Sequence, residues 1–355
     1  MKQFNNLTIE LDHGGGGYKS WELLKEIRNI LKFKGKWQNC EDDAAVLELA
    51  PLIKGGRGVR NGGNIKNPPN PLYQGGGLKL VFTTDAFIVD PIFFPGGDIG
   101  KIAMAGTIND LAVMGAKPLG ISLSIVIEEG FPKADLMKII SSIDKVSREA
   151  GVPVVTGDTK VTGKGKIDKI EITTSGIGIA EKIISNNGAK AGDLIIVSGY
   201  LGEHAVALLS SRFNYKTKIK SDSKPLNKEL EKVGKYLNAC KDPTRGGLAA
   251  NIVEMAGKSG VSVILDEKDL PYKKETIAVS ELLGIDISSL ASEGRFIAAV
   301  SPKNLSGVLK LLKNFNKDAK VIGRASQGKG VYLKTKLGSL RPIEMPKGKL
   351  IPRIC

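Results

Sequence analysis

Six aspartates stand where a predicted strand or helix could present a carboxylate to a ligand. Five border apolar runs or a predicted helix, and the sixth lies inside an otherwise apolar predicted helix; they are Asp42, Asp43, Asp85, Asp158, Asp242 and Asp110. Carboxylates are ligands that magnesium prefers, and magnesium bridges nucleotide phosphates. A site made mostly of acids can hold ATP only through such ions, so the pattern predicts a metal–nucleotide site. Any one acid could instead be a solvated side chain, and Asp242 with Thr244 could cap a helix.

The common nucleotide-binding motifs are absent from the sequence. Residues 13–20 come close to a Walker A loop but lack both of its fixed glycines, and no G-x-G-x-x-G segment follows a predicted strand. The glycines at 14–17 precede a predicted amphipathic helix at 18–33. Their backbone N–H groups could cradle a phosphate, or the run could be a flexible turn, and the sequence leaves both readings open.

Three cysteines, at 40, 240 and 355, show no zinc-binding spacing. Two of them can be explained as small buried residues. A core role is hard to assign to Cys355 because it is the last residue of the sequence. Its thiol is therefore a candidate for chemistry.

Composition favours a cytoplasmic protein with a substantial core. Of 355 residues, 41% are hydrophobic, and neither a long apolar span nor a signal peptide is expected. The net charge of +15 could indicate nucleic-acid binding. However, the lysines are dispersed along the chain with no interleaved aromatic side chains for base stacking, so we expect no specific nucleic-acid partner.

Strands and helices are predicted to alternate in two successive units, which indicates an α/β (α+β) fold with two domains. The first unit has predicted strands at 44–49, 78–84, 119–127, 152–156 and 168–180 and helices at 98–114 and 132–151. The second has strands at 194–197, 261–265, 294–300, 320–324 and 330–335 and helices at 203–213, 226–238, 244–258, 273–283 and 303–315. We therefore predict domains at 1–182 and 183–337 and a mobile tail at 338–355, with a flexible glycine-rich insert at 54–77.

Several motifs resemble those of the hydrogenase maturation factor HypE. They are Thr83–Pro91, Phe93–Lys101, Gly106–Ala112, Thr156–Val161, Asp242–Gly247, Ser292–Gly294 and the ending Pro352-Arg353-Ile354-Cys355. Most are shared with the superfamily of aminoimidazole ribonucleotide synthetase, selenophosphate synthetase and thiamine-monophosphate kinase. The run Phe-Phe-Pro-Gly-Gly-Asp-Ile-Gly-Lys at 93–101 and the terminal cysteine are the specific part. Another kinase or synthetase of the superfamily is the alternative.

The resemblance implies a two-domain aminoimidazole ribonucleotide synthetase-like fold whose first sheet pairs in a homodimer and closes a β-barrel. It implies that a carbamoyltransferase, HypF, loads a carbamoyl group on the terminal thiol. The HypE-type enzyme then uses ATP and Mg²⁺ to dehydrate this group to a thiocyanate. The cyanide passes to iron on a HypC–HypD scaffold and becomes a ligand of nickel–iron hydrogenase.

The resemblance also implies roles for individual residues. It assigns metal and ATP contacts to Asp43, Asp85, Asp110, Asp158 and Asp242, with Asp42 as a lesser candidate. Further nucleotide contacts fall to Thr84, Asn109, Gly157, Thr159 and Arg245. Cys355 carries the substrate, Glu293 removes a proton, and Lys160 orients the substrate or stabilises charge. His204 is expected to be structural rather than catalytic.

Overall fold

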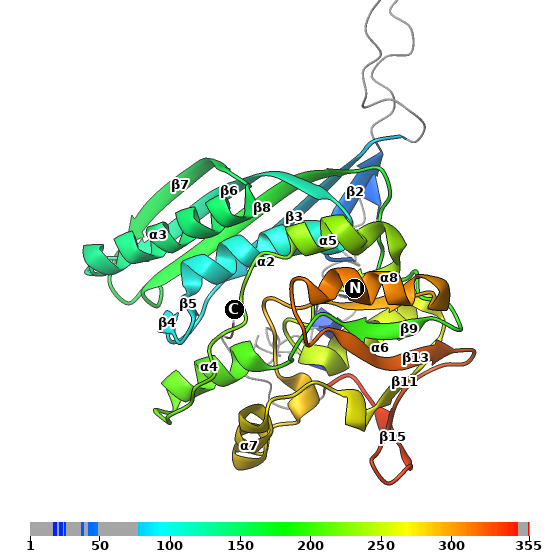
Figure 1. Cartoon of the computed structure of the whole chain (residues 1–355). Coiled ribbons are helices and arrows are strands. Elements are labelled where there is room, and N and C mark those ends of the chain that lie inside the picture. Colours follow the sequence, from blue (N-terminus) through cyan, green and yellow to red (C-terminus); the bar gives the residue numbers. More distant parts are fainter. Residues whose placement is uncertain are drawn as a thin grey trace, which may run out of the picture.

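Two β-sheets with their helices make up the computed structural model (Figure 1). The structure describes residues 17–19, 21–23, 25, 37–38, 42–48, 77–346 and 354. The described residues between 18 and 25 are helical, in agreement with the first predicted helix. The insert at 54–76 and Cys355 lie outside the described residues.

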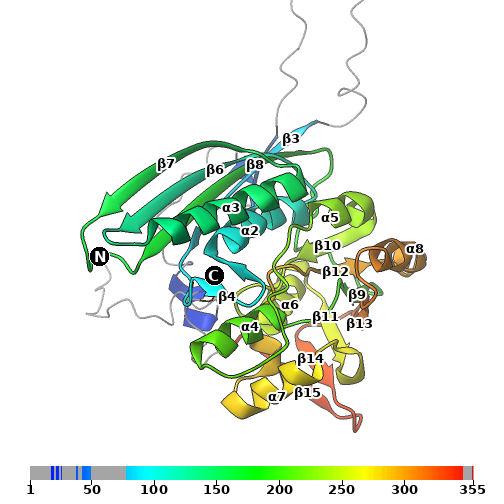
Figure 2. The same ribbon diagram turned by 60° about the vertical axis from the view of Figure 1, so that its left-hand side comes forward.

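The first sheet has the strand order β1-β2-β3-β8-β6-β7. Its strands are β1 (Trp37–Gln38), β2 (Ala45–Glu48), β3 (Lys79–Phe87), β6 (Lys117–Glu128), β7 (Val154–Thr162) and β8 (Ile170–Ala180). The helices α2 (Ile99–Val113) and α3 (Lys133–Ala150) cover one face, as the sequence predicts, and a short hairpin of β4 (Phe93–Phe94) and β5 (Gly97–Asp98) precedes α2 (Figure 1). Among the described residues, no helix covers the opposite face of the sheet, which we call the helix-free face (Figure 2).

Helix α2 is the central element of the first unit because it is buried on nearly all sides. Its N-terminus is capped by Asp98, whose side chain accepts a hydrogen bond from the Lys101 N–H. Close packing needs small residues on this helix: a Cβ at Gly100 would come within 2.6 Å of the Ile139 carbonyl oxygen on α3. A helix that packs against the sheet, α3 and the second unit at once can hold a polar residue such as Asp110 in a fixed position.

The second sheet has the order β10-β12-β9-β13-β11-β14-β15. Its strands are β9 (Leu194–Val197), β10 (Leu237–Lys241), β11 (Ser262–Asp266), β12 (Ile297–Val300), β13 (Lys320–Ser326), β14 (Val331–Lys334) and β15 (Leu340–Ile343). Its α-helices are α4 (Glu203–Arg212), α5 (Asn227–Val233), α6 (Gly247–Ser259), α7 (Lys274–Leu283) and α8 (Pro302–Lys313). Helix α5 also contacts α2, so the two units meet along that helix.

Two predicted elements are wrong. The helix expected at 226–238 ends at Val233, and Leu237–Lys241 forms β10, which pairs with β12. Tertiary pairing prevails there because β10 is largely buried against a neighbouring strand. The mobile tail expected from 338 begins too early, because Leu340–Ile343 pairs with β14 as β15.

Two strands are longer than predicted, which changes where their acids lie. Strand β3 continues to Phe87 and β7 continues to Thr162. Asp85 and Asp158 therefore lie inside strands rather than just beyond them. Alternation along a strand then decides which face of the sheet each side chain occupies.

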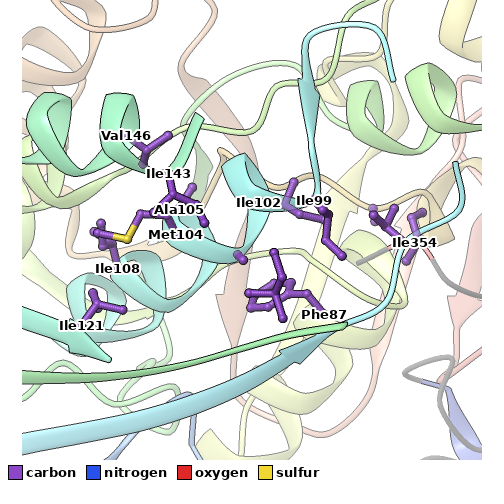
Figure 3. Packing of buried hydrophobic residues seen from close by; sticks show 14 of the residues in the cluster. Phe87, Ile99, Ile102, Met104, Ala105, Ile108, Ile121, Ile143, Val146 and Ile354 are labelled. Carbon is purple, nitrogen blue, oxygen red and sulfur yellow. The ribbon is translucent and has the colours of Figure 1, made fainter. Parts of the chain in front are cut away.

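Ile354 belongs to the apolar core of the first unit although it lies near the end of the sequence. Its side chain is buried and clusters with residues of α2 such as Ile99. Figure 3 shows Ile354 in the row of buried side chains that includes Phe87, Ile99 and Ile102. The segment that carries the terminal cysteine is thus anchored in the fold at one residue.

Candidate active site between the two units

Four of the predicted acids form a buried cluster where the first sheet meets the second unit. Asp110 is the acid whose environment is most unusual: burial raises its pKa well above the ordinary value, and the charges of Asp85, Asp242 and Asp43 raise it further. These four carboxylates come from β3, α2, the segment before β2 and the segment after β10. Carboxylates that repel one another in a buried place are groups whose charge a divalent cation would neutralise.

Thr83 is the residue that ties this cluster together, and the sequence analysis selected its neighbour instead. Its hydroxyl lies 2.9 Å from Asp110 Oδ2 and 3.0 Å from the Asp43 carbonyl oxygen. Thr84 points to the opposite face of β3, where it contacts Thr174 and Ser175. Because Asp85 lies two residues from Thr83, alternation from Asp85 could have identified Thr83.

Lys241, at the end of β10, reaches across to Asp43 and forms a buried ion pair with it. Its ammonium group also lies 3.5 Å from Glu254 on α6. Burial alone would lower the pKa of Lys241, but Asp43 and Glu254 outweigh burial and raise it, so the side chain stays charged. Sequence reasoning missed this residue, although it immediately precedes the Asp242 motif.

Asp42 is held away from the cluster by other partners. Its carboxylate accepts hydrogen bonds from Lys258 on α6 at 3.1 Å and from Ser185 at 2.6 Å. Asp43 Oδ2, in contrast, is buried with no hydrogen-bond partner among the described residues. An unsatisfied buried carboxylate oxygen favours Asp43 as the cation ligand of the doublet.

Asp242 follows β10 and starts the motif Asp-Pro-Thr-Arg-Gly-Gly. Burial raises its pKa to about 7, with a further contribution from Asp43. The turn into α6 requires its glycines: Gly247 has φ +60°, and a Cβ there would come within 2.6 Å of the Ser288 carbonyl oxygen. The motif therefore sets both the start of α6 and the position of the acid.

Glu293 lies at the same junction, buried and close to the cluster. Burial raises its pKa well above the ordinary value, and Asp242 and Asp222 add to this, whereas Arg245 lowers it. Its Oε1 has no hydrogen-bond partner among the described residues. A buried carboxyl group with a raised pKa and a free oxygen has the properties of a proton acceptor.

The backbone around Glu293 is fixed by a second set of buried charges. Its N–H donates to Asp222 Oδ1 at 3.1 Å, and Arg295 donates to Glu203 at 3.0 Å. Gly294 is required there because a Cβ would come within 2.0 Å of the Asp222 carbonyl oxygen. Both neighbours of Glu293 therefore have structural roles: Gly294 leaves room for the Asp222 carbonyl, and the Ser292 hydroxyl accepts a hydrogen bond from the Gly202 N–H.

Asn109 makes hydrogen bonds between the two units. It is buried, its amide donates to the carbonyls of Lys224 and Glu293, and its oxygen accepts from the Leu226 N–H at 2.8 Å. All three partners belong to the second unit. Asn109 therefore joins α2 to the loop that carries Glu293.

The predicted residues on β7 are not brought to the cluster within one copy of the chain. Asp158 and Lys160 pair with each other at 3.3 Å with both side chains exposed. They share the helix-free face of the sheet with Thr84, since Asp158 lies opposite Ser124 in the register. Thr159 is exposed on the same strand, and Gly157 lies against β6, where a Cβ would meet the Leu123 carbonyl oxygen at 2.5 Å.

His204 is buried and hydrogen-bonded on both ring nitrogens, as expected for a structural residue, but its partner near the end of the sequence was not predicted. The ring is fully buried, and its Nε2 lies 2.7 Å from the Ile354 carbonyl oxygen. Its Nδ1 lies 2.8 Å from Ser221 Oγ. The contact joins residues 150 positions apart in the sequence, so no local pattern could have revealed it.

The donor set fits magnesium in its chemistry, although no ready coordination shell is formed. Within the part of the chain that the structure describes, no three acidic, histidine or cysteine side chains stand in a metal-binding arrangement. Asp43 and Asp110 instead contact Lys241 and Thr83. The mutual repulsion of the four acids and the unpaired Asp43 oxygen are the features that a divalent cation would satisfy.

None of the helices in the described segments is long and apolar enough to span a lipid bilayer.

Both units match known sequence families. Residues 41–180 match the family described as AIR synthase related protein, N-terminal domain, and residues 190–336 match its C-terminal domain. Thiamine-monophosphate kinase from Aquifex aeolicus, at 18% identity and a TM-score of 0.64, shares the fold. The fold and the acid cluster thus place the chain in the AIR synthase-related class, which confirms the two-domain α/β prediction.

Relatives that match nearly the whole chain identify one family within this class. A carbamoyl dehydratase HypE of Cupriavidus necator is 37% identical over 98% of this chain and 95% of that protein. A putative hydrogenase expression/formation protein of Methanocaldococcus jannaschii is 43% identical over 98% of this chain and its own full length. The chain belongs to the HypE family.

Solved structures give the same result. A HypE–HypF complex superposes with a TM-score of 0.78 at 37% identity, covering 91% of this chain and 99% of that chain. A HypE in complex with ATP superposes with a TM-score of 0.76 at 32% identity, covering 98% of this chain and all of that chain.

Proposed function

We propose that this protein is an ATP-dependent carbamoyl dehydratase that converts an S-carbamoyl group on Cys355 into an S-cyanide. The product would supply the cyanide ligand of a nickel–iron hydrogenase. The observation that carries the proposal is the burial of Ile354 beside the loops that hold Glu293, because it tethers the neighbouring cysteine to the acid-lined junction. Support also comes from relatives named carbamoyl dehydratase HypE.

The chemistry requires that an amide oxygen become a leaving group. The carbamoyl oxygen attacks the γ-phosphorus of ATP, ADP leaves, and the nitrogen gives up one proton. The resulting S–C(=NH)–O–phosphate loses phosphate and the second nitrogen proton, which leaves S–C≡N. The overall change is carbamoyl thioester plus ATP to thiocyanate plus ADP and phosphate, so the oxygen of the lost water ends in phosphate.

We assign the nitrogen proton to Glu293. Its buried carboxyl group has a free Oε1 and a raised pKa, so its ionised form is a stronger base than an exposed glutamate. Arg245 acts on Glu293 electrostatically and favours the ionised form. Tethering of the substrate through the chain raises its effective concentration at this base.

We assign ATP binding and cation binding to Asp43, Asp85, Asp110 and Asp242. Magnesium, when bound by these carboxylates, would neutralise phosphate charge during transfer. Thr83 and Lys241 hold two of the acids in place. Lys241 also keeps a positive charge at the junction.

We propose a homodimer through the helix-free face of the first sheet. That face carries exposed apolar side chains on four strands, among them Phe82, Leu119, Val155 and Ile177. Exposed apolar side chains gathered on one face are typical of an interaction surface. Asp158 and Lys160 share the face, so we assign Asp158, Thr159 and Lys160 to contacts that form in the assembled dimer.

For partners, we propose a HypF-type carbamoyltransferase as the source of the carbamoyl group and a HypC–HypD scaffold as the acceptor of cyanide. The first rests on the similarity to a chain solved in a HypE–HypF complex. We place the protein in the cytoplasm and the domain boundary near 182, between β8 and β9.

The variant Cys355→Ala tests the function. We expect it to bind ATP as tightly as the unmodified protein and to form no thiocyanate when carbamoyl phosphate, ATP, magnesium and the carbamoyltransferase are supplied. Cys240→Ala is the matched control, because Cys240 is buried in the second sheet and should not be carbamoylated. Cyanide formation by Cys355→Ala would contradict the proposal.

A further inference from the structure

Ile354 is held at the C-terminal end of the sequence by both apolar and polar contacts. Its side chain is 5% exposed and belongs to the core of the first unit. Its carbonyl oxygen accepts a hydrogen bond from His204 Nε2 at 2.7 Å. His204 is on α4, in the second unit, so Ile354 contacts the first unit through its side chain and the second unit through its carbonyl oxygen.

The hydrogen bonds around His204 run in a single direction. The Ser223 N–H donates to Ser221 Oγ at 3.1 Å, and the Ser221 hydroxyl is then free to donate to His204 Nδ1 at 2.8 Å. The imidazole therefore carries its proton on Nε2, where the Ile354 carbonyl accepts it. Burial lowers the pKa of His204, which agrees with a neutral ring; Asp222 and Lys101 are the charged groups near it.

The loop at 93–98 builds the other wall of this site. The Phe94 ring meets the His204 ring edge-on, with centroids 5.3 Å apart and an interplanar angle of 84°. The Pro95 carbonyl accepts from the Ser221 N–H at 2.7 Å. Gly96 has φ +94°, and a Cβ on it would come within 2.8 Å of the Ser221 nitrogen. The Phe-Phe-Pro-Gly-Gly motif is therefore shaped to hold Ser221, and through it His204.

The same segment leads directly to Glu293. Asp222 follows Ser221 in the chain, and its Oδ1 accepts from the Glu293 N–H at 3.1 Å. Cys355 follows Ile354, and consecutive Cα atoms are about 3.8 Å apart. A fixed Ile354 thus limits how far the Cys355 thiol can move from the loops that carry Glu293.

We propose that His204, Ser221 and the loop at 93–98 form a docking site for the backbone and side chain of Ile354, and that His204 and Ser221 are positioning residues for the reaction at Cys355. A docked Ile354 keeps the next residue in the chain, Cys355, within reach of the loop that carries Glu293. The catalytic part of this inference rests on the proposed function, whereas the docking itself does not.

Docking can be measured without catalysis. The full-length protein is treated with iodoacetamide, and modification of Cys355 is followed by mass spectrometry of the Lys-C peptide 350–355, which contains no other cysteine. We expect His204→Ala to increase the modification rate by about 3- to 10-fold, the loss expected for one buried hydrogen bond. His204→Gln retains a donor near the Ile354 carbonyl and should stay closer to the unmodified protein.

Ile354→Ser tests the same site from the docked residue itself and leaves His204 and Ser221 in place. We expect a larger increase in Cys355 modification than for His204→Ala, because the apolar contact is lost, and Ile354→Val should restore most of the protection. Modification rates that are unchanged in His204→Ala and Ile354→Ser would overturn the docking site, whether or not the protein proves to be a dehydratase.

The catalytic role is tested with protein already carbamoylated on Cys355. In a single turnover with ATP and magnesium, we expect Ile354→Ser and His204→Ala to slow dehydration at least about 3-fold, as the docked fraction falls. Loading of the carbamoyl group by the partner should be as fast as, or faster than, in the unmodified protein. Equal slowing of both steps would overturn the positioning role, and absence of dehydration in the unmodified protein would reject the function but leave the docking result standing.

Discussion

The two faces of the first sheet carry the same kinds of residue in very different environments. On the helix-covered face, Asp85 lies beside Asp110 of α2, and burial together with the charges of Asp85, Asp242 and Asp43 raises the pKa of Asp110. On the helix-free face, Asp158 and Lys160 form an exposed pair. The difference shows that burial among like charges, and not the presence of an acid in a motif, prepares a group to bind a cation.

The largest expected effect comes from removing one acid of the buried cluster. Asp110→Asn should lower the rate of dehydration about 100- to 1,000-fold, since a preorganised charge at the transferring phosphate is lost. The same change should raise the melting temperature of the ligand-free protein by a few degrees, because it relieves repulsion. Thermal unfolding at pH 7.5 and single-turnover kinetics measure both quantities.

Asp158→Asn is the matched control on the exposed face. Its side chain is 65% exposed within one protomer and lies outside the buried cluster, so the substitution relieves no repulsion there and should not raise the melting temperature. A rise in melting temperature equal to that of Asp110→Asn would contradict the contrast between the two faces.

Lys241, which reaches the buried cluster from β10 of the second sheet, and Lys160, on the helix-free face of the first sheet, should differ in their contribution to stability. Lys241→Ala leaves Asp43 without its buried partner, whereas Glu254 keeps Lys258, and the change should cost about 3–5 kcal/mol of stability. Lys160→Ala removes a partner of Asp158 that is exposed within one protomer, so at dilutions where the protein is monomeric it should change stability by no more than about 0.5 kcal/mol. Chemical denaturation of both variants is the measurement, and equal midpoints would refute the comparison.

The cluster also predicts how stability depends on pH. Burial and neighbouring charges raise the pKa of Asp110 and Asp242, that of Asp242 to about 7, so the folded state binds protons that the unfolded state releases near pH 4. The stability that these groups contribute is therefore lost as pH rises from about 5 to 8, with a slope of up to about 1.4 kcal/mol per pH unit for each proton.

Thermal scans at pH 5.5 and pH 8 should show the ligand-free protein melting lower at pH 8. Magnesium should raise the melting temperature more at pH 8 than at pH 5.5, because the ionised carboxylates attract it. Asp110→Asn should reduce both differences. Stability that rises steadily over this range would show that the acids are already ionised without a cation.

Two adjacent threonines give the smallest and most local comparison. Thr83→Ala removes the hydroxyl that contacts Asp110 and the Asp43 carbonyl and should cost about 1–2 kcal/mol. Thr84→Ala acts on the other face of β3 and should cost less than about 1 kcal/mol. Kinetics should separate them further, with a lower dehydration rate for Thr83→Ala alone. A reversed order would mean that β3 presents its opposite face to the reaction.

Much of the fold follows from local pattern. The cap at Asp98 and the left-handed glycine after α2 delimit that helix close to where the sequence predicts it. Alternating strands and helices predict the two sheets. Thr84 was assigned from the motif that resembles the HypE family, and a motif does not define which face of β3 a side chain occupies.

Contacts that join distant segments could not be predicted. Leu237–Lys241 is short and could fit a helix, and only pairing with β12 makes it a strand. The Lys241–Asp43 pair and the His204–Ile354 hydrogen bond each join residues that are far apart in the sequence. Motifs identified the residue types of the site, whereas the partners that tune them come from the tertiary fold.

The most direct test of the account is the mass of the C-terminal peptide that contains Cys355. The protein is incubated with carbamoyl phosphate and the carbamoyltransferase partner, with magnesium present and with ATP either added or withheld after loading. The account predicts a carbamoyl adduct on Cys355 that loses the mass of one water only when ATP is added. An adduct whose mass does not change with ATP, or an unmodified Cys355 beside a partner that is active on a control, would contradict it.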